Sequence, residues 1–201
     1  MREEDQTNMP RPIWRHLCVD MQRIFYEQTP WHVEWMGGVL RAIEEVVGRY
    51  AEETIFTRFM PPIDASSAPG AWQPYYERWE SMTLHALPKE MVEVIPSLRK
   101  FIPPARLFDK TTYSPWTSGQ LHRVLSQEHV SSVVVSGGET DVCVLGTVLG
   151  AIDLGYHVVV LSDAVCSSAD ATHDAALKLL TDRFAIQLEM MTTEAFLSIA
   201  R

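Results

Sequence analysis

Short apolar runs alternate with longer stretches of helical periodicity along nearly the whole of this 201-residue chain. Within the runs, β-branched and other apolar residues follow one another directly, as in strands that are buried on both faces of a sheet. In the intervening stretches, apolar residues recur every three or four positions, as on one face of a helix. The predicted strands are 16–20, 54–59, 105–110, 131–137, 157–164 and 185–190, and the predicted helices are 39–50, 119–129, 142–155 and 173–184.

This alternation predicts parallel strands that are joined by right-handed crossovers. We therefore expect an α/β fold, a three-layer, doubly wound, Rossmann-like architecture in which helices cover both faces of a mainly parallel six-stranded sheet. Residues 60–104 interrupt the alternation and are rich in proline and aromatic residues, which predicts a long insertion with short helices. The sequence contains no internal repeat and no linker, so we expect residues 1–201 to form a single domain.

Charge and composition exclude several classes of function. The formal net charge is -9 and the Lys and Arg residues are scattered, so nucleic acid is not an expected partner. A membrane span needs roughly 20 consecutive apolar residues, and no stretch approaches that length. The opening "MREEDQTNMPRP" lacks the apolar core of a secretion signal. We expect a cytoplasmic protein that acts on a small molecule, without membrane partners.

The cysteines point to free-thiol chemistry. Cys18, Cys143 and Cys166 are odd in number and lack CxxC spacing, which favours neither a disulfide framework nor a structural zinc site. Cys143 alone lies at a predicted strand-to-helix turn, in "SGGETDVCVLG". Taken singly, each of the three is more simply interpreted as a core residue.

Three chemically distinct side chains lie at the carboxyl ends of predicted strands, where ligands bind in doubly wound sheets. Asp20 ends the first strand, Lys110 ends the third, and Cys143 opens the helix after the fourth. An acid, a cation and a nucleophile are therefore predicted to converge. Taken alone, Asp20 is equally explained as a helix cap, and Lys110 is better explained as a solvated strand end.

The chemistry of a cysteine nucleophile needs partners of these kinds. If Thr140 is the N-cap, Cys143 lies near the positive end of a helix dipole, which together with Lys110 would stabilise a thiolate. Asp20 is positioned to accept the thiol proton and to pass it to a leaving amine. Gly137 and Gly138 allow a sharp turn, so that the amides that follow can face an oxyanion.

Three segments resemble the isochorismatase-like cysteine hydrolases: "CVDMQRIF", "FDKTTYSPW" and "VVVSGGETDVCVLGTVLGAIDLGYHVVVLSDAVCSS". By this resemblance, Asp20, Lys110 and Cys143 match the Asp-Lys-Cys triad of the family. Gly138 and Glu139 match its cis peptide bond, and the turn through Thr140 matches its oxyanion site. The resemblance implies hydrolysis of an amide, carbamoyl or related C–N bond through a thioester intermediate.

The chain departs from the metal-dependent branch of that superfamily. Nicotinamidases carry an Asp-x-His motif and a further His for a metal after the second strand, whereas this chain reads "TRFMPPIDASSAPG" there. Because that stretch lacks an imidazole, we expect neither a metal nor another cofactor. The alternatives are a non-catalytic or regulatory binding protein on the same fold, and an isochorismatase-type vinyl-ether hydrolase. A dinucleotide enzyme is disfavoured, since no GxGxxG follows the first strand.

Candidate substrate-binding residues follow the ends of the strands that carry the triad. Aromatic side chains there favour a planar or apolar substrate group, although many such residues serve the core or a subunit contact. Arg58 is a candidate to pair with Glu139 or to bind a substrate carboxylate, the alternative being a surface charge. The predicted substrate-binding set is Phe25, Trp31, Arg58, Tyr113 and Trp116.

A homo-oligomer is expected on two grounds. The resembled family commonly forms dimers or tetramers. The segment "GAWQPYYERW" carries aromatic side chains that would need burial, for which a homodimer or homotetramer interface would serve.

Overall fold

The computed structural model describes residues 13–200 and contains one six-stranded sheet in the order β3-β2-β1-β4-β5-β6. Every neighbouring pair of strands is parallel. The strands are β1 (Ile13–Val19), β2 (Thr54–Phe59), β3 (Arg106–Lys110), β4 (Val130–Gly138), β5 (His157–Cys166) and β6 (Leu188–Met191). The predicted doubly wound α/β fold is confirmed.

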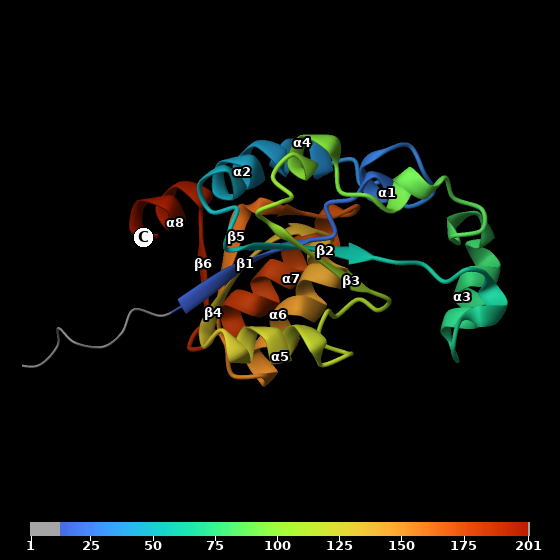
Figure 1. The fold of residues 1–201 in the computed structure, drawn as a ribbon. Helices are drawn as coiled ribbons and strands as arrows, with labels where there is room; N and C mark the ends of the chain where they lie inside the picture. Colours follow the sequence, from blue (N-terminus) through green and yellow to red (C-terminus); the bar gives the residue numbers. More distant parts are fainter. Residues whose placement is uncertain (1–12, 201) are drawn as a thin grey trace, which may run out of the picture.

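Helices cover both faces of the sheet (Figure 1). On one face lie α1 (Arg23–Tyr26), α2 (Met36–Arg49), α4 (Pro96–Arg99) and α8 (Thr193–Ile199). On the other face lie α5 (Gln120–Gln127), α6 (Leu145–Asp153) and α7 (Asp170–Arg183). Two apolar cores result, one that includes Ile43 and Val46 of α2, and one that includes Val148 of α6 and Leu180 of α7.

Most predicted elements agree with the structure to within a few residues, and β2 agrees at both ends. The strand starts differ most at β1, which was predicted from residue 16 and begins at Ile13, and at β6, which was predicted from residue 185 and begins at Leu188. A turn occupies the intervening residues: the amide of Gln187 donates to the carbonyl of Phe184, and Ile186 is 94% exposed. Because Ile186 is apolar although it lies in this turn, the predicted strand began before the true one.

The predicted insertion contains η1 (Ala65–Ser67), α3 (Trp72–Arg78), η2 (Glu80–Met82), η3 (Lys89–Val92) and α4. Helix α3 lies beyond the carboxyl end of β2 (Figure 1). The side chain of Gln22 joins the insertion to the sheet, because its amide donates to the carbonyls of Phe59 and Val92 and accepts from the amide of Phe59. The insertion therefore lies near the carboxyl ends of the strands, where the ligand site was predicted.

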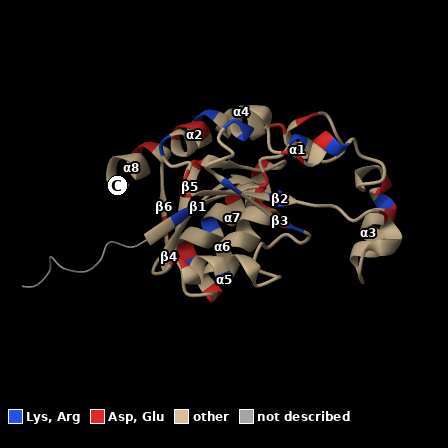
Figure 2. Cartoon of the chain, in the orientation of Figure 1, with Lys and Arg blue, Asp and Glu red and all other residues tan. Residues whose placement is uncertain are grey.

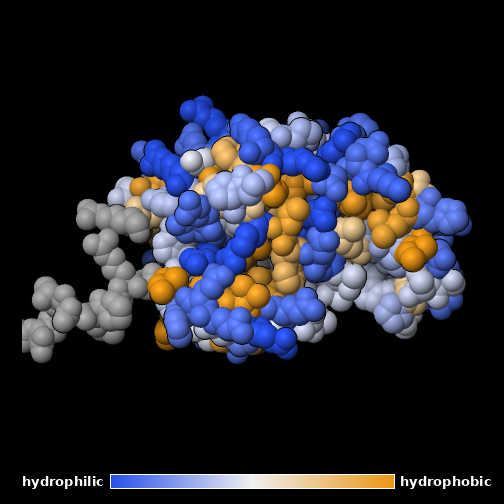
Figure 3. Space-filling view, viewed as in Figure 1, coloured by the Kyte–Doolittle hydropathy of each residue, from blue (hydrophilic) through white to orange (hydrophobic). Residues whose placement is uncertain are grey.

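Charged side chains of both signs are interspersed over the outer helices, as α2 and α3 illustrate (Figure 2). Hydrophobic side chains gather between the two helical layers, over the sheet edge formed by β3 (Figure 3). Leu107 of this edge strand is 41% exposed. Among residues 13–200, no helix has the length and apolar character that crossing a membrane requires.

Candidate active site

Asp20 follows β1 directly and is fully buried. Its φ is 50°, in the left-handed region that short polar side chains tolerate better than most others. Thr57 of β2 fixes its orientation: the Thr57 hydroxyl accepts from the Asp20 amide at 3.1 Å and donates to Oδ1 at 2.6 Å. Oδ2 is left to face the other members of the site.

Lys110 reaches Asp20 from the end of the edge strand β3. Its Nζ lies 2.7 Å from Asp20 Oδ2 and donates to the carbonyls of Thr112 and Tyr113 at 3.0 and 2.9 Å. Burial alone would lower the pKa of Lys110, but the negative charge of Asp20 opposes burial, and this pKa lies above its usual value. The ammonium is therefore charged at neutral pH.

Cys143 lies in a π-helical turn, Thr140–Val144, that leads into α6. The predicted N-cap role of Thr140 is wrong, because Glu139 occupies the cap position and the Thr140 hydroxyl pairs with Nδ1 of His173 at 2.9 Å. Cys143 is 7% exposed, and Asp20 and Lys110 are near enough for their charges to act on its thiol. The structure thus brings Asp20, Lys110 and Cys143 together.

The resting state of Cys143 differs from the predicted thiolate. Burial raises the pKa of the Cys143 thiol well above its usual value, the charge of Asp20 raises it further, and Lys110 opposes both without overcoming them. A turn of helix does not offset burial among apolar side chains. The free protein therefore holds a neutral thiol beside a carboxylate that can receive its proton.

This difference predicts the pH dependence of alkylation. We expect the rate constant for reaction of Cys143 with iodoacetamide to keep rising between about pH 7 and about pH 9 without a plateau, because only the thiolate reacts. Peptide mass spectrometry would follow Cys143 separately from Cys18 and Cys166. A plateau that is reached below about pH 7 would contradict the raised pKa and would indicate a stabilised thiolate.

Two glycines shape the turn before Cys143. Gly137 has a φ of 109°, and a Cβ there would lie 2.1 Å from the carbonyl oxygen of Val19. Only glycine therefore fits where β4 passes the end of β1. The peptide bond between Gly138 and Glu139 is cis, and the Glu139 carbonyl accepts from the amides of Val142 and Val144.

A cavity of about 230 Å³ opens above Cys143. Its walls come from the segments after β1, β3 and β5, the end of β2, the insertion and the turn before α6. It is lined by Phe25, Pro30, Trp31, His32, Phe59, Tyr75, Tyr113, Glu139, Val142, Cys143 and Ser168. Three of the predicted substrate-binding residues, Phe25, Trp31 and Tyr113, belong to this lining, while Phe59 and Tyr75 were not predicted.

A family model for the isochorismatase domain matches residues 16–194. The chain belongs to the isochorismatase family. This family membership confirms the resemblance found in the sequence and identifies the protein as a member of a family of hydrolases.

Curated relatives share parts of this isochorismatase domain. Isochorismatase family protein 1B of Dictyostelium discoideum is 36% identical over 94 residues, 46% of this chain and 44% of the relative. The secreted isochorismatase effector Isc1 of Phytophthora sojae is 39% identical over 77 residues, 38% of this chain and 37% of the relative. The matched segments thus span less than half the length of these relatives.

Solved structures extend the likeness over nearly the whole chain. A cysteine hydrolase from Pseudomonas syringae pv. phaseolicola is 25% identical with a TM-score of 0.79, covering 92% of this chain and 91% of that one. N-carbamoylsarcosine amidase from Thermoplasma acidophilum is 18% identical with a TM-score of 0.73, covering 90% and 97%. The second likeness concerns the fold alone.

Two residues predicted to bind substrate in this isochorismatase-family protein serve the scaffold instead. Trp116 is 8% exposed, and its Nε1 donates to the carbonyl of Thr147 at 2.8 Å while its ring stacks on Tyr156. Arg58 is bound by Asp109, through two hydrogen bonds of 2.7 and 2.9 Å, and by Glu93 at 2.9 Å. Neither lines the cavity above Cys143, because each side chain is held by neighbouring elements.

The side chains near the cavity do not fit a metal. Within residues 13–200, no group of three or more His, Cys, Asp and Glu side chains is placed to hold an ion. His16, the histidine nearest to Asp20 in the sequence, lies in the core between Thr54 and Ser136, and burial lowers its pKa to about 3. It is a neutral structural residue.

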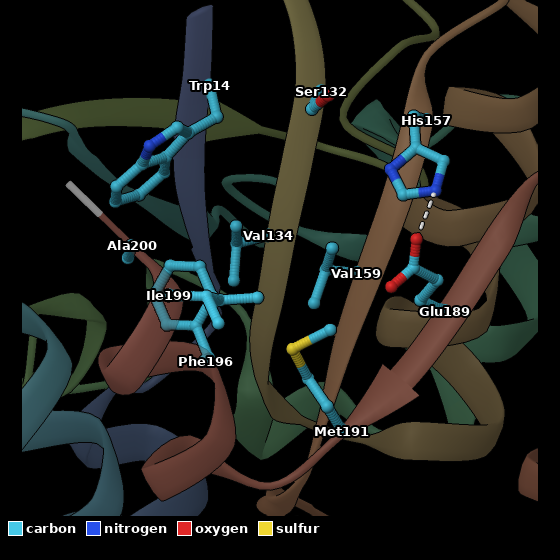
Figure 4. Close-up of a pocket in the computed structure, with 10 residues that line it drawn as sticks. All are labelled: Trp14, Ser132, Val134, His157, Val159, Glu189, Met191, Phe196, Ile199 and Ala200. Atoms are coloured by element: carbon cyan, nitrogen blue, oxygen red, sulfur yellow. Dashed lines mark ion pairs between the residues drawn. The ribbon is translucent and has the colours of Figure 1, made fainter. Parts of the chain in front are cut away.

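A larger cavity of about 480 Å³ lies at the opposite end of the strands (Figure 4). Trp14, Ser132 and His157, near the starts of β1, β4 and β5, contribute to its walls. His157 pairs there with Glu189 at 3.2 Å, and apolar side chains of α8 close one side (Figure 4). Because this cavity contains no cysteine, we assign the chemistry to the smaller cavity above Cys143.

Proposed function

We propose that this protein is a metal-independent cysteine hydrolase that cleaves the C–N bond of a small amide or carbamoyl compound through a thioester on Cys143. The observation that carries the proposal is the buried cluster at the base of the smaller cavity, where Asp20 and Lys110 both act on the Cys143 thiol. The cavity volume, about 230 Å³, lies below the roughly 300–1,000 Å³ of drug-sized ligand sites and suits a small substrate.

Acylation begins with proton transfer. Asp20 takes the proton of the Cys143 thiol as the sulfur attacks the substrate carbonyl carbon, which forms a C–S bond and moves the carbonyl electron pair onto oxygen. Amides in the turn through Thr140 and Cys143 stabilise this oxyanion. The intermediate collapses as the C–N bond breaks, the nitrogen takes the proton from Asp20, and ammonia or an amine leaves.

Deacylation uses the same groups in reverse. Asp20 takes a proton from water as the water oxygen attacks the thioester carbonyl carbon. The C–S bond then breaks, the acid product leaves, and the sulfur recovers its proton from Asp20. One water is consumed for each amide that is cleaved, and the side chains return to their starting protonation states.

Lys110 supports both half-reactions without exchanging a proton. Its fixed charge lies 2.7 Å from Asp20 and also acts on the sulfur, so it stabilises whichever of the two is negative as the proton moves between them. In a water-poor pocket, such a preorganised charge stabilises a transition state more strongly than it would in water.

A substrate screen tests the proposal. We expect the purified protein to release ammonia or an amine from at least one compound in a panel of small amides, carbamoyl compounds, ureides and lactams. We expect this activity to persist after exhaustive chelation, because the described residues offer no metal ligand set. Loss of activity on chelation, with recovery on adding zinc, manganese or iron, would contradict metal independence. Release of pyruvate from isochorismate, without amide cleavage, would favour the vinyl-ether alternative.

We also propose a homo-oligomer, on a different basis from the one the sequence offered. The aromatic side chains of "GAWQPYYERW" pack within the chain, since Tyr75, Tyr76 and Trp79 all contact Trp31. The support is instead the exposed apolar surface over β3, where Leu107 lies (Figure 3). A purely monomeric species in sedimentation velocity at micromolar concentration would contradict it.

A cytoplasmic location likewise stays a prediction.

A further inference from the structure

The cavity above Cys143 carries a negative charge that no cation of the described chain neutralises. Asp20 and Lys110 form an ion pair, and their charges cancel. Glu139 also lines the cavity, and among residues 13–200 it forms no ion pair. Its Oε1 accepts one hydrogen bond, from the amide of Ser168 at 3.2 Å, so a neutral donor and not a cation holds the side chain in place.

Glu139 is close enough to act on the groups around it. Burial is the main cause that raises the pKa of both Tyr75 and Tyr113, and the negative charge of Glu139 adds to it in each case. Glu139 also contributes to the raised pKa of Cys143. Glu139 lines the same cavity as Cys143, Tyr75 and Tyr113, so its carboxylate lies near the nucleophile and near two phenol rings that stay neutral at physiological pH.

Aromatic rings form most of the remaining wall. Phe25, Trp31, Phe59, Tyr75 and Tyr113 all line the cavity. Trp31 lies at the centre of this group, with ring centroids 6.2 Å from Phe25, 6.1 Å from Phe59 and 6.0 Å from Tyr75. One cation of the chain already lies over these aromatic rings, since Nζ of Lys110 is 5.3 Å from the centroid of Phe59. Aromatic faces beside a carboxylate attract a second cation for the same electrostatic reason.

The residue that would favour an anionic substrate is absent from this lining. Arg58, the arginine at the end of β2, is bound by Asp109 and Glu93. A substrate carboxylate would instead meet Glu139, and like charges in a desolvated cleft repel strongly.

We propose that the substrate is a small amide or carbamoyl compound that bears a positive charge, such as an ammonium or quaternary ammonium group, held by Glu139 and the aromatic wall. This inference rests on the proposed function for the bond that is cleaved. The recognition of the cation is a separate property of the cavity, and binding measurements test it without turnover.

Two isosteric amides provide the probe. Trimethylammonioacetamide and 3,3-dimethylbutanamide have nearly the same shape and differ by a charged nitrogen in place of a carbon. We expect calorimetry on the Cys143→Ala protein to give a dissociation constant about tenfold or more lower for the cation, at low ionic strength.

Variants of Glu139 and Glu189 then show which carboxylate causes the preference for the cation. Glu139→Gln keeps the shape and the hydrogen bond of the side chain and removes its charge, so we expect most of the preference for the cation to disappear in the same background. Glu189→Gln removes an equivalent charge from the cavity at the other end of the strands, and we expect the preference to be unchanged. Equal binding of the two amides, binding of neither, or a preference that survives in Glu139→Gln would overturn the inference.

Turnover by the wild-type protein separates this inference from the proposed function. Tight binding of the cation without cleavage of any amide in the panel would contradict the hydrolase proposal and leave the cation site supported. Cleavage of both amides with equal kcat/KM, together with equal binding, would support the hydrolase and overturn the cation site.

Discussion

Cys143→Ala is expected to abolish hydrolysis, with kcat falling by about four or more orders of magnitude, as loss of the nucleophile does in enzymes that form covalent intermediates. Without the sulfur no thioester forms, and no second cysteine of residues 13–200 lines the small cavity. The same large loss is expected for Cys143→Ser, because a hydroxyl is far less acidic than a thiol and Asp20 alone is a weak base for it. Ammonia release under saturating substrate measures the effect.

A second cysteine supplies the matched control. Cys166 of β5 is also buried and lies close to Gly138, but it does not line the cavity above Cys143. We expect Cys166→Ala to keep activity within about fivefold of wild type, as for most substitutions that remove no reacting group. Circular dichroism and thermal unfolding would show that both alanine variants fold. Retained turnover in a folded Cys143→Ala protein would refute the mechanism.

Asp20 and Lys110 are expected to affect both activity and stability. Asp20→Asn and Lys110→Met should each lower kcat by about two or more orders of magnitude, since each removes a charge that acts in proton transfer. Each single substitution also leaves one charge buried without its partner. Breaking a buried ion pair in this way costs about 3–5 kcal/mol of unfolding free energy, which urea denaturation would measure.

The double variant separates the two effects. Asp20→Asn combined with Lys110→Met buries no unpaired charge, so we expect it to regain most of the stability that either single variant loses. We expect it to remain inactive, because restoring charge balance does not restore a proton acceptor. Recovery of activity in the double variant, or wild-type activity in either single variant, would show that the pair is only structural.

The ends of the strands that carry the triad were predictable from the sequence, because each apolar run stops close to where its strand ends. Asp20 and Lys110 lie at the ends of predicted strands, Cys143 lies in the turn after another, and parallel strands present their carboxyl ends at the same edge. Their convergence therefore followed from local pattern and fold class together. Thr57, which orients Asp20 through two hydrogen bonds, was not identified, because a threonine inside a strand is ordinary by composition.

The cavity walls were less predictable because they depend on tertiary packing. Tyr75 comes from the insertion, whose position is set by aromatic contacts with Trp31 and not by strand register. Trp116 was predicted to bind substrate because it closely follows a strand end in the sequence. It instead packs against α6, so closely that a Cβ at Gly150 would lie 2.3 Å from its ring. Likewise, nothing local to Arg58 indicated that Glu93, far along the insertion, would bind it.

The protonation state of Cys143 also could not be predicted from the residues around it in the sequence. A turn after a strand predicted stabilisation of a thiolate by the helix dipole and by Lys110. The decisive effect is burial of the sulfur beside Asp20, which raises the pKa of the thiol. That balance depends on how closely three strands and the insertion surround the sulfur.

We expect the reaction to pass through a covalent thioester on Cys143. Acid quenching during turnover of a substrate found in the screen, followed by peptide mass spectrometry, tests it most directly. We expect a Cys143 peptide that is heavier by the acyl group of the substrate, and absent when substrate is omitted or when Cys143 is replaced by serine. Continued turnover with Cys143 unmodified at every quench time, and with no hydroxamate formed when hydroxylamine is present to intercept the thioester, would contradict it.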